Sequence, residues 1–252
     1  MAREALSAVV TTFNNADTLD ACLRGVAWAD EIVVLDSGST DATLAIAAHY
    51  GARIHSQPFA GYGVQKQAAI DLASHRWVLL LDSDESLATD DAAVLQQALV
   101  APAHAGYQLW RREWQFWRWQ SRRGRLNHYV RLFDRQRARM SGHEVHEEVQ
   151  VDGSVGVLDV VIDHYGEPDI AGRVDKANRY SSMQLADLAR RKVTWLRLRM
   201  VMYPTVAFLR YYVLRGHWRS GWAGFIAARV HAFYAFLKYT KLYESQRWQR
   251  RD

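Results

Sequence analysis

Short unbroken apolar runs alternate with amphipathic stretches along the N-terminal part of the chain. The runs LSAVVTTF from Leu6, EIVVLD from Glu31 and WVLLLD from Trp77 predict strands that are buried on both faces. A shorter strand is predicted in ARIHSQP, and the intervening stretches carry apolar residues at helical spacing. Strands that alternate with helices predict an α/β fold built on a mainly parallel, doubly wound sheet.

The pattern changes in the second half of the chain. Residues 106–119 predict a strand that runs into a stretch rich in Trp and Arg. Residues 193–244 predict two or more helices, with a break near 215–217. We therefore divide the chain into an α/β domain, 1–168, and a helical region, 169–252, in which Trp, Tyr and Phe mix with Arg at helical spacing.

Charge is distributed unevenly between these two parts. The 252 residues carry a net charge of +5, but the segment from Arg190 to Asp252 holds 14 Lys and Arg against 2 Asp and Glu, a balance of +12. The preceding residues therefore carry −7. A basic, aromatic helical region predicts amphipathic helices that bind an anionic membrane surface; a core-packing helical layer or a dimer face is the alternative.

Cysteine content and hydropathy favour a reducing compartment. Cys22 is the single cysteine, which excludes an internal disulfide, and the N-terminal residues do not fit a secretory signal. No run reaches the ~18 apolar residues of a transmembrane helix. We expect a cytoplasmic protein that is peripheral on the inner membrane.

Polar segments follow three of the predicted strands: TTFNN, DSGSTD and DSDES. Carboxyl ends of parallel strands share one edge of a sheet, and ligands of doubly wound sheets bind there. In the third segment Asp82 and Asp84 alternate with Ser83, so both carboxylates can face one opening. Carboxylates join Mg²⁺ or Mn²⁺ to substrate phosphates, so the segment predicts a divalent metal. The alternative is a set of turns that favour Asp, Ser and Gly, followed by a capped helix.

In this order, the motifs VVTTFNNADTL, VVLDSGSTDAT, QKQAAI and LLLDSDE resemble the family 2 glycosyltransferases over residues 5–165. The resemblance implies a GT-A fold, which is a Rossmann-like, mainly parallel sheet flanked by helices, here with a C-terminal helical extension. It implies that Thr11, Phe13 and Asp36 hold the base and ribose of a nucleotide sugar, and that Lys66 faces the diphosphate.

The same resemblance implies roles for the acidic segment. Asp82 would bind the ribose and the metal, and Asp84 would bind the metal, which neutralises the departing diphosphate. His164, at the end of a predicted strand, is a candidate third metal ligand, as in some GT-A enzymes. A hydrogen-bonded structural histidine is the alternative at that position.

A narrower resemblance concerns the substrates. FAGYGVQKQAAI, VRLFDR, VHEEV and IDHYG are similar to the lipopolysaccharide core glycosyltransferases of Gram-negative bacteria, although Gln67 stands where relatives usually carry Asn. The similarity implies an inverting transfer of a hexose, glucose from UDP-glucose, to the inner core of lipopolysaccharide or a related lipid-linked glycan.

An inverting transfer needs one base that takes a proton from the acceptor hydroxyl. The segment GHEVHEEV offers Glu144, Glu147 and Glu148, and the resemblance favours Glu147 as the catalytic base. A solvated edge strand is the alternative for this segment. Its H-E-x-H spacing differs from the helical H-E-x-x-H of zinc peptidases, so we reject a zinc site.

Two other functions are compatible with parts of the sequence. A nucleic-acid-binding module would suit the basic, aromatic helices, but phosphates repel an uncompensated acidic sheet edge, so we expect no nucleic-acid partner. A metal-dependent nucleotidyltransferase would need a Gly-rich loop after the first strand, and TTFNNAD has none. Residues 115–119 fit the Q-x-x-R-W signature of processive polysaccharide synthases, but in those enzymes the signature follows the catalytic base, and here it precedes the predicted one. We interpret 114–125 instead as a mobile flap over the substrates.

Overall fold

The chain forms two compact units in the computed structural model. Unit 1 comprises Met1–Arg111 and Asn127–Tyr165, and unit 2 comprises Arg112–Leu126 and Gly166–Asp252. The sequence assigns the segment 112–126 to the α/β domain, whereas the structure groups it with the C-terminal helices. The residues that the structure describes are 2–141, 148–167, 169–191 and 193–248.

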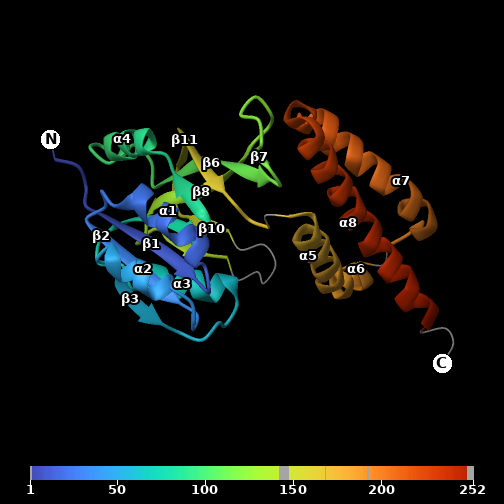
Figure 1. Cartoon of the computed structure of the whole chain (residues 1–252), viewed down its shortest axis with the longest axis horizontal. Helices are drawn as coiled ribbons and strands as arrows, with labels where there is room; N and C mark the ends of the chain where they lie inside the picture. The colour runs from blue at the N-terminus through green and yellow to red at the C-terminus, as the bar shows by residue number, and fades with distance from the viewer. Residues whose placement is uncertain (1, 142–147, 168, 192, 249–252) are drawn as a thin grey trace. The chain divides into compact units, whose positions relative to one another are not determined.

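Unit 1 begins with the predicted alternation of strands and helices and continues with further strands (Figure 1). Its elements are β1 (Leu6–Thr12), α1 (Ala16–Val26), β2 (Glu31–Asp36), α2 (Thr43–His49), β3 (Arg53–Ser56), α3 (Tyr62–Asp71), β4 (Trp77–Asp82), β5 (Glu85–Leu87), α4 (Thr89–Ala98), β6 (Gly106–Gln115), β8 (Asn127–Asp134), β9 (Ala138–Met140), β10 (Val149–Val151) and β11 (Val155–His164). The last residues of β6, from Arg112, belong to unit 2.

The main sheet has the strand order β3-β2-β1-β4-β8-β6-β11-β5 in the described part of unit 1. The four strands from β3 to β4 are parallel, while β8 is antiparallel to both β4 and β6. In the register of the parallel strands, Thr11 pairs with both Leu35 and Asp82, and Thr12 pairs with Asp36. The prediction that the three polar segments follow strands ending at one sheet edge is therefore confirmed.

Both faces of the parallel strands are buried, as their unbroken apolar runs predict. Side chains alternate along a strand, and the buried residues separate accordingly into two core clusters. Val10 and Leu81 pack in the cluster that includes residues of α1 and α4, whereas Val9 and Leu80 pack in the cluster that includes Ile70 of α3. A sheet covered on both faces leaves its carboxyl-end edge as the place for a site.

Unit 2 is helical apart from the β6 end and the short strand that pairs with it. Helices α7 and α8 pack antiparallel (Figure 1), because Tyr203 contacts Tyr239 while Phe208, further along α7, contacts the earlier Phe225. None of the described helices is long and apolar enough to cross a membrane. The elements are β7 (Arg118–Trp119), α5 (Ile170–Met183), α6 (Leu185–Arg190), α7 (Leu196–Leu209), a π-helical turn (Arg210–Leu214), a 3-10 turn (His217–Ser220) and α8 (Gly221–Trp248).

Candidate active site

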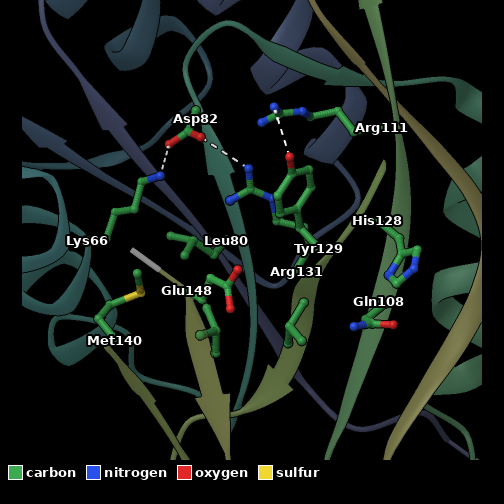
Figure 2. Close-up of a pocket in the computed structure, with 12 residues that line it drawn as sticks. Lys66, Leu80, Asp82, Gln108, Arg111, His128, Tyr129, Arg131, Met140 and Glu148 are labelled. Carbon is green, nitrogen blue, oxygen red and sulfur yellow. Dashed lines mark hydrogen bonds and ion pairs between the residues drawn. The ribbon is translucent and has the colours of Figure 1, made fainter. Parts of the chain in front are cut away.

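A pocket of about 430 Å³ opens in unit 1 at the carboxyl end of β4 (Figure 2). Its walls come from α3, β4, β6, β8 and the β9–β10 hairpin, which the sheet order brings together from distant parts of the sequence. Most of the lining side chains are charged or polar: Lys66, Asp82, Gln108, Arg111, His128, Tyr129, Arg131 and Glu148. The pocket therefore suits a polar, charged ligand.

Asp82 is held between two cations in this pocket. Its Oδ1 lies 2.8 Å from Lys66 Nζ, and its Oδ2 lies 3.1 Å from Arg131 Nη2 (Figure 2). Burial raises the pKa of the Asp82 carboxyl, but the charges of Lys66 and Arg131 outweigh burial and hold this pKa well below its usual range. Asp82 is therefore ionised, and Lys66 lies beside it.

Glu85 forms a second anionic centre behind Asp82. Its carboxylate is fully buried and lies 2.5 Å from Arg131 Nη2 and 3.3 Å from Arg111 Nη1. The backbone N–H of Asp82 donates to Glu85 Oε2 at 3.1 Å, so Glu85 also fixes the end of β4. Burial lowers the pKa of the Arg131 guanidinium, but Glu85 and then Asp82 raise it above its ordinary value.

These five side chains form one alternating charge network. Lys66, Arg131 and Arg111 contribute three positive charges, and Asp82 and Glu85 contribute two negative charges. Lys66, Arg111 and Arg131 offer the donors that phosphate oxygens accept, which suits an anionic ligand such as a diphosphate. The sequence reasoning missed Arg131, Arg111 and Glu85, although a charged residue inside the apolar run of VRLF was a signal for the first of them.

Asp84 and His164 are brought together at the next turn of the chain. Asp84 Oδ2 lies 3.2 Å from His164 Nε2, because β5 pairs antiparallel with β11 and sets Glu85 opposite His164. Burial raises the pKa of Asp84, but the hydrogen bond and charge of His164 have the larger combined effect and hold this pKa below its ordinary value. Ser83 and Asp84 form a turn between β4 and β5, so the segment is not extended as the predicted alternation requires, and Ser83 is buried.

The donor set fits a divalent ion only in part. Asp84 and His164 supply an oxygen and a nitrogen, while Asp82 in this structure meets Lys66 and Arg131. Across the described residues, no group of three or more His, Cys, Asp or Glu side chains is placed to hold a metal. Mg²⁺ often binds through one or two protein groups together with substrate phosphates, and this pair is compatible with that mode.

The residues predicted for the nucleotide lie at the ends of β1 and β2. Phe13 is 56% exposed, and Thr11 is partly exposed in the register position beside Asp82. Asp36 is buried and accepts hydrogen bonds from the backbone N–H groups of Gly38 and Ser39, both at 2.9 Å. The Asp36 carboxylate thus stabilises the loop after β2.

The Glu-rich segment is described only at its end. Glu144 and Glu147, the predicted base, lie outside the described residues. Glu148 lines the same pocket as Asp82, and its backbone exchanges hydrogen bonds with Ser141 at the start of the β9–β10 hairpin. One carboxylate of the predicted cluster is therefore present at the pocket.

The segment interpreted as a flap is anchored within unit 2. Gln115 Nε2 lies 2.8 Å from Nδ1 of the buried His217, and the N–H of Arg125 donates to the carbonyl of Arg215 at 2.9 Å. Gln115 is itself buried. The match to the polysaccharide synthase signature therefore falls on a residue with a packing role in unit 2.

Comparison with known proteins identifies the family. The model described as "Glycosyl transferase family 2" matches residues 7–184. The chain belongs to this family. This family 2 glycosyltransferase is 30% identical over 248 residues, covering 95% of its chain and 92% of the relative, to the lipopolysaccharide core biosynthesis glycosyltransferase LpsC of Rhizobium meliloti (strain 1021). It is 28% identical over 256 residues to an uncharacterized glycosyltransferase of Rickettsia felis, covering 96% and 90% of the two chains.

Solved structures include a more distant relative. Glucosyl-3-phosphoglycerate synthase from Mycobacterium tuberculosis, in complex with Mn²⁺, UDP and glucosyl-3-phosphoglycerate, is 24% identical with a TM-score of 0.37. The likeness covers 44% of this chain and 44% of that one, less than half of either. The expected fold class, a mainly parallel sheet flanked by helices with a C-terminal helical extension, is confirmed by the strand order, and the expected enzyme class by the family.

Proposed function

We propose that this glycosyltransferase moves a hexose, glucose from UDP-glucose, with inversion onto the inner core of lipopolysaccharide or a related lipid-linked glycan. The observation that carries the proposal is the pocket at the end of β4, where three cations surround Asp82 and Glu85. The family supports a nucleotide-sugar donor, and the similarity to LpsC, a lipopolysaccharide core biosynthesis glycosyltransferase, supports the acceptor class.

The donor diphosphate takes the positive side of the pocket. Lys66 and Arg131 bind its oxygens, and Asp82 orients both cations through its two ion pairs. Thr11, Phe13 and Asp36 hold the ribose and base at the ends of β1 and β2.

Asp84 and His164 would hold Mg²⁺ or Mn²⁺, with Asp82 as a further oxygen ligand. The metal, when bound, supplies Lewis-acid stabilisation of the departing diphosphate. The Asp84–His164 contact, at 3.2 Å, already holds the two proposed ligands side by side.

Glu147 is the proposed base, because it belongs to the V-H-E motif of the resembled enzymes. Glu148 is its rival, since its side chain lines the pocket that contains Asp82. Glu147→Gln should lower turnover by ~10²–10⁴ with donor affinity unchanged, because the base contacts the acceptor hydroxyl and not the nucleotide. If Glu148→Gln gives that loss and Glu147→Gln keeps native turnover, the base is Glu148.

With a lipid-linked acceptor, the protein would act at the cytoplasmic face of the inner membrane. Exposed apolar side chains on unit 2 support this proposal, including Trp195, Val201, Val206 and Leu214. Val201→Ser with Leu214→Ser should weaken binding to phosphatidylglycerol vesicles. The control is Val157→Ser in unit 1, where an exposed valine (54%, against 70% for Val201) should have no effect. Equal vesicle binding by all variants would exclude this membrane face.

Calorimetry with nucleotide sugars, with and without Mn²⁺, tests the donor. UDP-glucose should bind, and Lys66→Gln should weaken it by at least ~10-fold, since a charge-assisted contact to phosphate is lost. Asp84→Asn should abolish transfer in a folded protein, whereas Asp187→Asn, at an exposed carboxylate of unit 2, should not. Transfer that persists at the native rate in EDTA would exclude the metal role, and failure of every nucleotide sugar to bind would exclude the proposed function.

A further inference from the structure

Unit 2 contains a second pocket, of about 370 Å³, between α7, the π-helical turn and α8. Arg210, Arg215 and Lys238 line it, and no acidic residue is among the lining side chains that the structure describes. In the described part of the chain, none of these three cations forms an ion pair with a carboxylate. The pocket therefore presents positive charge that no carboxylate of the described residues pairs with.

Aromatic rings, not carboxylates, surround Lys238 in this pocket. Lys238 Nζ lies 5.1 Å from the ring centre of Tyr203, 5.7 Å from that of Tyr234 and 5.2 Å from that of Tyr239. The negative faces of the rings stabilise the ammonium but leave its net charge in place. Burial, followed by the charge of Arg191, lowers the pKa of Lys238, as expected for a cation without an anionic partner.

The π-helical turn shapes the opposite wall. The N–H of Arg215 donates to the carbonyl of Arg210 at 3.0 Å, five residues back, so this turn is wider than an α-helical one. Such turns occur frequently at functional sites. Tyr211, within the turn, is stacked between His217 and His231, with ring centres 4.0 and 4.3 Å away, so its ring is fixed before any ligand binds.

We propose that this pocket binds a phosphorylated sugar, through phosphate on the cations and the sugar ring against the tyrosines. Arginine and lysine are the residues that bind phosphate oxygens, and tyrosine rings offer apolar faces to a sugar. A volume of about 370 Å³ lies within the range of small-molecule sites. This inference rests on the proposed function, because that function supplies the phosphorylated sugar: the phosphate-bearing headgroup of the lipid-linked acceptor.

The experiment measures binding to the full chain without any nucleotide sugar. The probes are phosphatidylcholine vesicles doped with lipid A, whose sugars carry phosphate monoesters, the same vesicles doped with phosphatidylglycerol, and soluble glucose 6-phosphate. If the protein binds lipid A vesicles but not glucose 6-phosphate, the ligand of the pocket is a lipid headgroup. If the protein also binds glucose 6-phosphate, and the pocket variants weaken that binding equally, the ligand is a free sugar phosphate.

Lys238→Gln and Arg210→Gln should each weaken the bound probe by at least ~10-fold, because a charge-assisted contact is lost. Arg229→Gln is the matched control, since it removes the same charge from the exposed surface of α8 outside the pocket. Arg210 is exposed, so its variant should fold even if Lys238→Gln does not.

Equal affinities for Arg210→Gln and Arg229→Gln would overturn the proposal. Phosphatidylglycerol binding as tight as lipid A binding, with the same dependence on Arg210, would also overturn it in favour of a general anionic-lipid surface. UDP-glucose calorimetry on the same variants separates this result from the donor site. A failed donor titration with intact lipid A binding would reject the proposed function and leave the pocket assignment standing.

Discussion

Replacing Arg131 with methionine should destabilise unit 1 strongly. Arg131 lies in β8, is almost fully buried, and contacts both Glu85 at 2.5 Å and Asp82 at 3.1 Å. Methionine has a similar length but no charge, so the fully buried carboxylate of Glu85 would lose its nearest cation. Breaking a buried ion pair by removing one partner costs about 3–5 kcal/mol, because the remaining charge is left uncompensated.

The contacts that survive place the expected loss near the lower end of that range. Glu85 would keep Arg111 at 3.3 Å and the N–H of Asp82 at 3.1 Å. We therefore expect the free energy of unfolding to fall by about 3 kcal/mol. Adding Glu85→Gln to Arg131→Met should recover part of the loss. The double variant should lose about 1–3 kcal/mol less free energy of unfolding than the two single variants lose in sum.

Urea unfolding followed by circular dichroism gives these free energies, and hydrogen exchange of the β4 and β8 amides localises them to unit 1. The control is Arg24→Met, which removes an exposed ion pair with Asp20 on α1 and should change the free energy of unfolding far less, because solvent screens that pair. If Arg131→Met unfolds at the same urea concentration as Arg24→Met, or if the double variant is additive, the buried network does not stabilise the fold as argued.

Three further perturbations have expected outcomes. Gly25→Ala should destabilise unit 1 by about 1–3 kcal/mol in urea unfolding, because its Cβ would lie 2.9 Å from the backbone carbonyl oxygen of Leu87. Glu31 has a pKa of about 2: burial raises it, but hydrogen bonds, first from Ser7, lower it more. The contribution of Glu31 to the free energy of unfolding should be complete above pH 4.5 and should fall by up to about 3 kcal/mol toward pH 2. Glu31→Gln should reduce this dependence of stability on pH. Burial lowers the pKa of His217 to about 4, so unit 2 should lose up to about 3 kcal/mol as pH falls from 6.5 to 4, and His217→Asn should flatten that profile.

The parallel half of the sheet was predictable because its signals are local. Each buried strand is an unbroken apolar run, and each run ends in polar residues within the same short segment. The register that sets Thr11 beside Asp82 then follows from parallel strands of similar length that start at the same edge. The three polar segments could be assigned to one sheet edge for this reason, whereas Lys66 was assigned through the family resemblance alone.

The cations around Asp82 were not predictable in the same way. Arg131 reaches Asp82 only because β8 pairs antiparallel with β4, with Leu132 opposite Leu79. Periodicity shows that a strand exists, but it does not show which strand lies beside it or in which direction. Asp36 illustrates a second limit, since D-S-G-S does not by itself predict that the Asp36 carboxylate accepts hydrogen bonds from the N–H groups of Gly38 and Ser39.

The two cationic pockets of this glycosyltransferase differ in what balances their positive charge. In unit 1, Asp82 and Glu85 lie 2.5 to 3.3 Å from their cations, so most of each cation's field is cancelled before a ligand arrives. In unit 2, the rings around Lys238 attract it without carrying net charge. An anion that enters the second pocket meets uncompensated charge, whereas one that enters the first meets cations that are already paired with carboxylates. A divalent ion at Asp84 and His164 would add positive charge to the first site, where the protein's own cations are already paired. The second pocket needs no added cation to attract an anion.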